Sequence, residues 1–189
     1  WHPSSANAAD ASTSLANKNA KFRFKGIASH AAAAPERGRS ALDGVESMNY
    51  MINMMREHIP QDTRIHYVIT NGGKAPNVVP DFAEVRYMIR HPDITELKDM
   101  WARIGKAAEG AAMGTGTRVE IELASGLYGL LPNETLAKQM HKNLSSLGGV
   151  EYDEEEIKWA TEIQKTFNSP KVPSLDVAKK VQPYALNFF

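Results

Sequence analysis

Three polar side chains stand out in this sequence because their neighbours either expose them or fix them. His30 lies between Ser29 and Ala31, and such small neighbours leave an imidazole accessible. A loop histidine of this kind can donate a hydrogen bond to an oxygen that becomes negatively charged during a reaction. Composition alone leaves open the simpler interpretation of an ordinary surface histidine.

Asn77 lies within the segment GGKAPNVVPD, which begins at Gly72 and ends at Asp81. Its glycines and prolines restrict the loop to few conformations, so the carboxamide could recognise a carbonyl or carboxylate group. Taken alone, the segment is explained more simply as a long hairpin connection. Arg90 ends an alternating segment on its polar side, where a guanidinium can hold a carboxylate through two hydrogen bonds. Solvated arginines are also common at strand ends.

The elements that would position these groups follow from the spacing of the apolar residues. Alternation predicts four strands, and spacings of three and four predict two amphipathic helices between them. The first helix is capped by Ser40 and ends near His58, and the second is capped by Asp93 and stops at Gly114. The strands are expected over residues 21–27, 65–69, 83–90 and 119–123.

The order β-α-β-β-α-β predicts an α+β fold with one water-exposed sheet face and one face under both helices. Right-handed crossovers then give a ferredoxin-like sandwich with a four-stranded antiparallel sheet. Its edges would be the second and fourth strands, and an open edge over residues 64–70 is a natural place for a second subunit to pair. We expect His30, Asn77 and Arg90, which all adjoin strand ends, to gather at one side of this sheet.

Three parts of the chain are expected on this basis. Residues 1–19 form a linker at the end of another domain's first part, 20–126 the ferredoxin-like domain, and 127–189 a helical return segment with caps at Asn133 and Asp153. The acidic run that begins at Asp153 suits the positive end of a helix and is interpreted as solvated rather than as a metal site. Both flanks look like pieces of one interrupted domain.

Composition narrows the class of partner. The chain has 22 basic and 22 acidic residues and no basic run, which argues against nucleic acid or an anionic membrane as the main partner. No apolar stretch reaches the roughly 18 residues of a membrane span. Without cysteine, disulfides and cysteine-ligated zinc are excluded. The first residues do not resemble a signal peptide, so a cytoplasmic location is the default expectation.

Taken in order, the motifs form a recognisable set. Gly26 and Ser29-His30-Ala31 come first, then Gly-Gly-x-Ala-x-Asn-Val-Val-Pro-Asp, then an arginine thirteen residues after Asn77. This set resembles the lid of the aminoacylase- and carboxypeptidase-type two-metal hydrolases, over about residues 20–126. The resemblance implies an amidohydrolase that cleaves an N-acyl glutamate-type amide with two divalent metal ions, manganese or zinc. It also implies dimerisation through the lid, with an identical or a related subunit.

The same resemblance implies a role for each residue of the set. His30 would stabilise the tetrahedral intermediate in the partner subunit's active site. Asn77 and Arg90 would bind the substrate carboxylate or the oxyanion, and His2 matches the place of a metal ligand. An alternative is a non-catalytic ferredoxin-like dimerisation or ligand-binding module, in which these residues are incidental. A nucleic-acid-binding sheet of this fold would need paired aromatic residues and a basic stripe, which the sequence lacks.

The sequence departs from a complete hydrolase of this kind in its metal ligands. A two-metal site needs several such ligands and a general-base carboxylate. The remaining histidines show no spacing typical of metal ligands: His58, His66, His91 and His141. We therefore expect the other ligands to lie outside residues 1–189. The segment alone should bind no metal tightly and should be inactive.

Overall fold

The computed structural model describes residues 6–168, 172 and 174–183. Two compact units make up the chain. One is Ser14–Leu130, and the other combines Trp1–Thr13 with Leu131–Phe189. None of the described helices is both long enough and apolar enough to cross a membrane.

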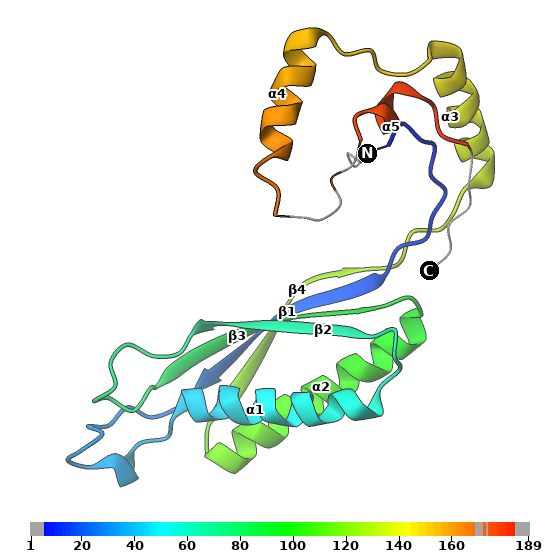
Figure 1. Cartoon of the computed structure of the whole chain (residues 1–189). Helices are drawn as coiled ribbons and strands as arrows, with labels where there is room; N and C mark the ends of the chain where they lie inside the picture. The colour runs from blue at the N-terminus through cyan, green and yellow to red at the C-terminus, as the bar shows by residue number, and fades with distance from the viewer. Residues whose placement is uncertain (1–5, 169–171, 173, 184–189) are drawn as a thin grey trace. The chain divides into compact units, whose positions relative to one another are not determined.

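The unit Ser14–Leu130 contains one sheet and two long helices. Its elements are β1 (Ala16–Lys25), α1 (Ala41–Met55), β2 (Arg64–Asn71), β3 (Phe82–His91), α2 (Ile94–Thr115) and β4 (Arg118–Leu127), with short 3-10 helices at Pro35–Arg37 and Arg56–His58. The strands are ordered β2-β3-β1-β4 and all neighbours are antiparallel. Both helices lie on the same side of the sheet (Figure 1). The predicted ferredoxin-like fold, with its second and fourth strands at the edges, is confirmed.

Two element boundaries differ from those predicted. β1 begins at Ala16, so the expected linker to residue 19 is wrong over its last four residues. Those residues have weak strand propensity, but they pair with both β3 and β4, and such tertiary pairing overrides local preference. α2 continues through Gly114 and ends at Gly116, whose φ of 66° takes the left-handed conformation that favours glycine.

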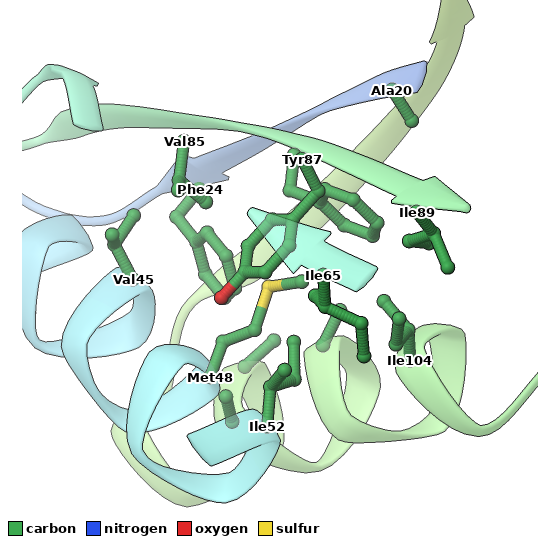
Figure 2. Close-up of a cluster of buried hydrophobic side chains, with 14 of the residues drawn as sticks. Ala20, Phe24, Val45, Met48, Ile52, Ile65, Val85, Tyr87, Ile89 and Ile104 are labelled. Carbon is green, nitrogen blue, oxygen red and sulfur yellow. The ribbon is translucent and has the colours of Figure 1, made fainter. Parts of the chain in front are cut away.

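The core lies between the sheet and the two helices. Phe24 of β1, Met48 of α1 and Tyr87 of β3 are fully buried there, and Figure 2 shows Met48 and Ile52 pointing from α1 toward the sheet. The Tyr87 hydroxyl donates a hydrogen bond of 2.5 Å to the carboxamide oxygen of Asn49, so this buried polar group is satisfied. Burial raises the pKa of the Tyr87 phenol. The sheet therefore rests on a rigid, well-filled layer.

Edge strand β2 and the neighbouring surface of α1 keep several apolar side chains exposed. On the strand these are Tyr67, Val68 and Ile69, and on the helix Tyr50 and Met54 are more than half exposed. A link between the two elements comes from Arg56, whose Nη1 donates to the carbonyl oxygen of Ile65 at 2.8 Å. An unpaired strand edge with apolar neighbours is suited to pairing with another chain.

The second unit is helical, with α3 (Glu134–Leu147), α4 (Glu154–Gln164) and the short α5 (Asp176–Lys179). The predicted caps are present, since Asn133 accepts from the amide of Leu136 and Asp153 accepts from the amide of Glu156. The Glu156 carboxylate in turn accepts from the Asp153 amide, which completes a capping box. This use of the acidic run agrees with a helix start.

Candidate functional site

The loop that carries His30 begins at a close backbone approach just after β1. A Cβ added to Gly26 would lie 1.9 Å from the carbonyl oxygen of Arg39, so no larger residue fits there without a shift. The next residue, Ile27, exchanges two backbone hydrogen bonds with Arg39, of 2.8 and 2.9 Å. The loop between Ile27 and Arg39 is therefore closed at its base, which fixes where His30 projects.

His30 lies beside Asn77, although the two are far apart in sequence. Residues 30 and 78 form an isolated antiparallel bridge. The amide of Ala31 donates to the carbonyl oxygen of Asn77 at 3.0 Å, and the amide of Val79 donates to the carbonyl oxygen of Ser29 at 2.9 Å. The two loops thus form a short ribbon beyond the end of the sheet, which we call the loop end. Both His30 and Asn77 are exposed there.

The hydrogen bonds of His30 determine which ring nitrogen is available. Its Nδ1 accepts from the amides of Ala32 and Ala33, at 3.2 and 3.1 Å. A nitrogen that accepts carries no proton, so in the neutral imidazole the proton is on Nε2. His30 therefore presents an N–H donor from Nε2 while its own loop holds the ring. This is the group that stabilisation of an oxyanion requires.

Arg90 lies at the opposite end of the sheet, so the prediction that all three groups gather in one place is wrong. In the β1–β3 ladder Lys25 pairs with Phe82 at the loop end, whereas Arg90 pairs with Asn17 eight residues further along. At ~3.4 Å per residue the Cα atoms of Phe82 and Arg90 are about 27 Å apart. The physical reason is strand direction. His30 follows the end of β1 and Asn77 precedes the start of β3, but Arg90 is near the end of β3.

The surroundings of Arg90 are nevertheless suited to an anion. Its side chain is exposed, and its Nη2 contacts the sulfur of Met88 at 2.9 Å. Two further arginines, Arg64 and Arg86, point to the same open face of the sheet, and sequence reasoning missed both. Alternation along β3 could have identified Arg86, because positions 86 and 90 share a face. Arg64 needs the β2–β3 register, in which it pairs directly with Arg90.

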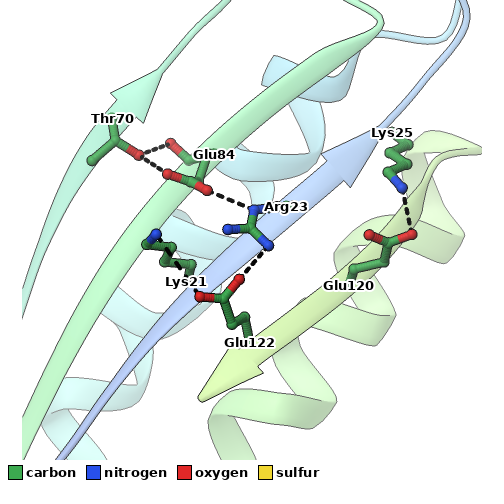
Figure 3. A network of polar contacts seen from close by, with 7 residues as sticks. All are labelled: Lys21, Arg23, Lys25, Thr70, Glu84, Glu120 and Glu122. Atoms are coloured by element: carbon green, nitrogen blue, oxygen red, sulfur yellow. Dashed lines mark hydrogen bonds and ion pairs between the residues drawn. The ribbon is translucent and has the colours of Figure 1, made fainter. Parts of the chain in front are cut away.

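Closer to the loop end, the open face holds a network of paired charges (Figure 3). Arg23 donates to Glu84 at 2.7 Å and contacts Glu122 at 2.5 Å, while Lys25 pairs with Glu120 at 2.5 Å. Thr70 also donates to Glu84, at 2.7 Å. The Thr70 hydroxyl and the Arg23 guanidinium hold the pKa of the Glu84 carboxyl below its ordinary value. These charges satisfy one another and offer little to a ligand.

Metal ligands are not brought together in the part of the chain that the structure describes. No group of three or more histidine, cysteine, aspartate or glutamate side chains there could hold a metal ion. His2, the one candidate ligand, lies outside the described residues. The described residues by themselves thus do not fit a two-metal centre.

The hollows of the surface do not coincide with His30 either. A shallow hollow of about 350 Å³ lies next to its loop, lined by Ala31, Pro35 and Val79 among others, but not by His30 or Asn77. The site at the loop end is therefore a projecting surface rather than a pocket. A projecting donor has to be inserted into a cleft that other residues supply.

Comparison with known proteins places this geometry in context. Residues 16–114 match the family described as Peptidase dimerisation domain. The chain is 45% identical over 170 residues to a p-aminobenzoyl-glutamate hydrolase chain of Escherichia coli, covering 89% of this chain and 35% of that protein. It is 34% identical over 148 residues to Xaa-Arg dipeptidase of Mus musculus, covering 78% of this chain and 34% of that protein. The chain thus spans about a third of the length of these relatives.

Solved structures agree on the fold. An amidase of the hydantoinase/carbamoylase family from Burkholderia vietnamiensis superposes with a TM-score of 0.63 at 17% identity, covering 75% of this chain and 34% of that one. The aminobenzoyl-glutamate utilization protein from Klebsiella pneumoniae superposes with a TM-score of 0.56 at 20% identity, covering 70% and 35%. At such identities the likeness concerns the architecture alone.

Proposed function

This chain belongs to the peptidase dimerisation domain family, and from that premise we propose that it is the lid of a metal-dependent amidohydrolase. The substrate class would be an N-acylated acidic amino acid, of the p-aminobenzoyl-glutamate type that the name of the Escherichia coli relative gives. The observation that carries the proposal is the exposed N–H donor of His30, held by two backbone amides beside Asn77. We expect the two divalent metal ions, manganese or zinc, to be bound by residues other than those described above.

His30 would act on the oxygen of the scissile carbonyl. When a nucleophile adds to the amide carbon, that oxygen gains negative charge, and the Nε2–H of His30 can donate a hydrogen bond to it. The neighbouring carboxamide of Asn77 can donate a second hydrogen bond to the same oxygen or to a substrate carboxylate. His30 keeps its proton throughout, since a neutral imidazole is a donor at Nε2 without being an acid.

The two ends of the sheet would serve two different active sites. Ser14 and Leu130, where the chain enters and leaves this unit, are joined by a hydrogen bond of 3.0 Å and lie near the Arg90 end of the sheet. His30 and Asn77 project from the other end. We infer that Arg90 contacts the substrate in its own subunit's site, while His30 and Asn77 reach the site of the partner subunit.

The contact between subunits would form along β2. Pairing of two β2 strands would satisfy the free backbone groups of the edge and cover Tyr67 and Ile69. Tyr50 and Met54 of α1 would pack against the partner helix, which extends the apolar interface. The partner would be an identical chain or a related subunit, and nothing in this surface requires nucleic acid or a membrane.

Mixing of two inactive variants of the full-length hydrolase tests this assignment. In a dimer of one His30→Ala subunit and one Arg90→Gln subunit, one site receives an intact Arg90 from its own chain and an intact His30 from its partner. After dissociation and random reassociation, half of the dimers are mixed, so activity should recover to about a quarter of wild type. Each variant mixed with itself is the control and should stay inactive. Failure of the mixture to recover would show that His30 and Arg90 come to a site from the same subunit.

A further inference from the structure

Three arginines form a stripe along the open face of the sheet. Arg64 of β2 and Arg90 of β3 are direct cross-strand partners, and Arg86 lies on the same face of β3, four residues from Arg90. Between them lie His66 and Met88, which are also cross-strand partners. All three arginines are exposed. We call Arg64, Arg86 and Arg90 the arginine stripe.

The arginine stripe has no acidic counterpart within the described residues. No carboxylate there lies within 4.0 Å of any of its three guanidinium groups, since every ion pair on this face belongs to the network around Arg23 and Lys25. Like charges directly opposite each other in a sheet are destabilising. The Arg64–Arg90 pair therefore costs free energy in the folded chain, and a bound anion would remove that cost.

Local contacts hold these guanidinium groups while leaving most of their N–H donors free. Arg86 donates from Nε to the carboxamide oxygen of Asn19 at 2.9 Å, and Asn19 is buried, at 6% relative exposure. Arg64 donates from Nη1 to the carbonyl oxygens of Gln61 and Thr63, both at 2.9 Å. A guanidinium has five N–H donors, so each still has unused donors directed to solvent or to a ligand.

We propose that the arginine stripe binds an acidic chain, so that the substrate class extends from a single acidic residue to oligoglutamyl amides. The proposal rests on the function above, in which Arg90 contacts the substrate carboxylate. Cross-strand partners such as Arg64 and Arg90 have Cα atoms about 5 Å apart, and Arg86 lies about 13 Å from Arg90 along its strand. One carboxylate cannot contact both places. An extended chain of three acidic residues spans roughly 10 Å and, with its side chains, can contact both.

Binding measurements on the complete 189-residue chain test the stripe without requiring hydrolysis. The probes are glutarate, with two carboxylates, and α- and γ-linked triglutamate, which carry four. Calorimetry would compare the unmodified chain with Arg64→Gln, Arg86→Gln and Lys25→Gln. The last variant is the matched control, because it removes one cation from the same face, but one already paired with Glu120. Thermal melting would verify that each variant is folded.

The expected result is that one of the triglutamates binds at least tenfold more tightly than glutarate. Arg64→Gln and Arg86→Gln should each lose about tenfold in triglutamate affinity, as expected for loss of a charge-assisted bidentate contact. They should leave glutarate binding within twofold, and Lys25→Gln should change neither. The proposal is overturned if triglutamate shows no preference over glutarate, or if Lys25→Gln weakens binding as much as Arg86→Gln does. It is also overturned if the arginine variants change only the sedimentation of the chain, because the stripe would then contact a carboxylate of another subunit.

Kinetics of the full-length hydrolase separate this inference from the proposed function. If the enzyme cleaves an amide with one glutamate, and Arg86→Gln lowers kcat/KM equally for substrates with one and three glutamates, the stripe is wrong while the amidohydrolase proposal stands. If neither amide is cleaved but triglutamate still binds to the stripe, the amidohydrolase proposal fails, and with it the assignment of that anion as a substrate.

Discussion

The charge network near the loop end and the arginine stripe occupy the same face of one sheet, but they treat their cations differently. Lys21, Arg23 and Lys25 are matched by Glu84, Glu120 and Glu122 on the neighbouring strands. Arg64, Arg86 and Arg90 have no such partners among the described residues. Alternating carboxylates and cations are enough to build this face, as the first group demonstrates. The second group is therefore not explained by folding, which directs attention to a ligand.

The same comparison applies to the two groups proposed to touch substrate. At the loop end a single imidazole is held by its own backbone and projects from the surface. At the far end several guanidinium groups lie flat on a sheet. A projecting neutral donor suits a small, transient oxyanion, whereas a flat cationic stripe suits permanent negative charge spread along a chain. The two ends are thus adapted to the reacting and the non-reacting parts of an acidic amide.

The largest expected effect comes from removing the donor at the loop end. In the full-length hydrolase, His30→Ala should lower kcat by a factor of about 100–1,000, the usual cost of deleting one oxyanion donor, with little change in KM. His66→Ala removes an imidazole from the other end and serves as the control, for which kcat should stay within a few-fold of wild type. A His30→Ala enzyme with near-normal kcat would mean that the loop end takes no part in catalysis.

The backbone approach beneath His30 should be the next most sensitive feature. Gly26→Ala places a methyl group against the carbonyl oxygen of Arg39, so we expect a loss of about 1–3 kcal/mol in the free energy of unfolding and a lower kcat as His30 moves. Gly126→Ala is the matched control in β4, where an added Cβ would meet nothing closer than 3.8 Å. Denaturant titration and steady-state kinetics of both variants would measure the difference. Equal stabilities would show that the Gly26 loop accommodates the methyl group and does not fix His30.

Much of the fold was predictable from local pattern, because alternation and helical spacing depend on each element's own residues. The position of Arg90 was predictable too, but only by following strand direction, since the end of β1 and the start of β3 lie together in an antiparallel pair. The facing of Arg64 on Arg90 was not. It depends on the β2–β3 register, which is set by the loop after Asn71 and by an irregularity between Ile69 and Asn71.

Within the charge network, Glu84 is the carboxylate whose loss should matter most. Its pKa is lowered in the folded state, so its contribution to stability is present above the ordinary carboxyl pKa and is lost as the pH falls through the lowered value. Glu84→Gln should therefore cost at most about 1 kcal/mol at pH 7, because solvent screens the group. The difference from wild type should vanish at low pH. Thermal unfolding from pH 3 to pH 7 would measure it, and a gap that widens on acidification would contradict the assigned direction.

The arginine stripe should give the smallest effect on stability and one of opposite sign. Arg64→Gln removes a like-charge contact with Arg90, so in the absence of ligand the chain should become more stable by a few tenths of a kcal/mol. Lys25→Gln breaks a pair with Glu120 and should be slightly destabilising, which makes it the internal reference for urea titrations at low salt. Adding salt should shrink both changes, since both are electrostatic and exposed. If Arg64→Gln instead destabilises the chain at low salt, the guanidinium contributes to folding after all, and the contrast between the two halves of the open face loses its physical basis.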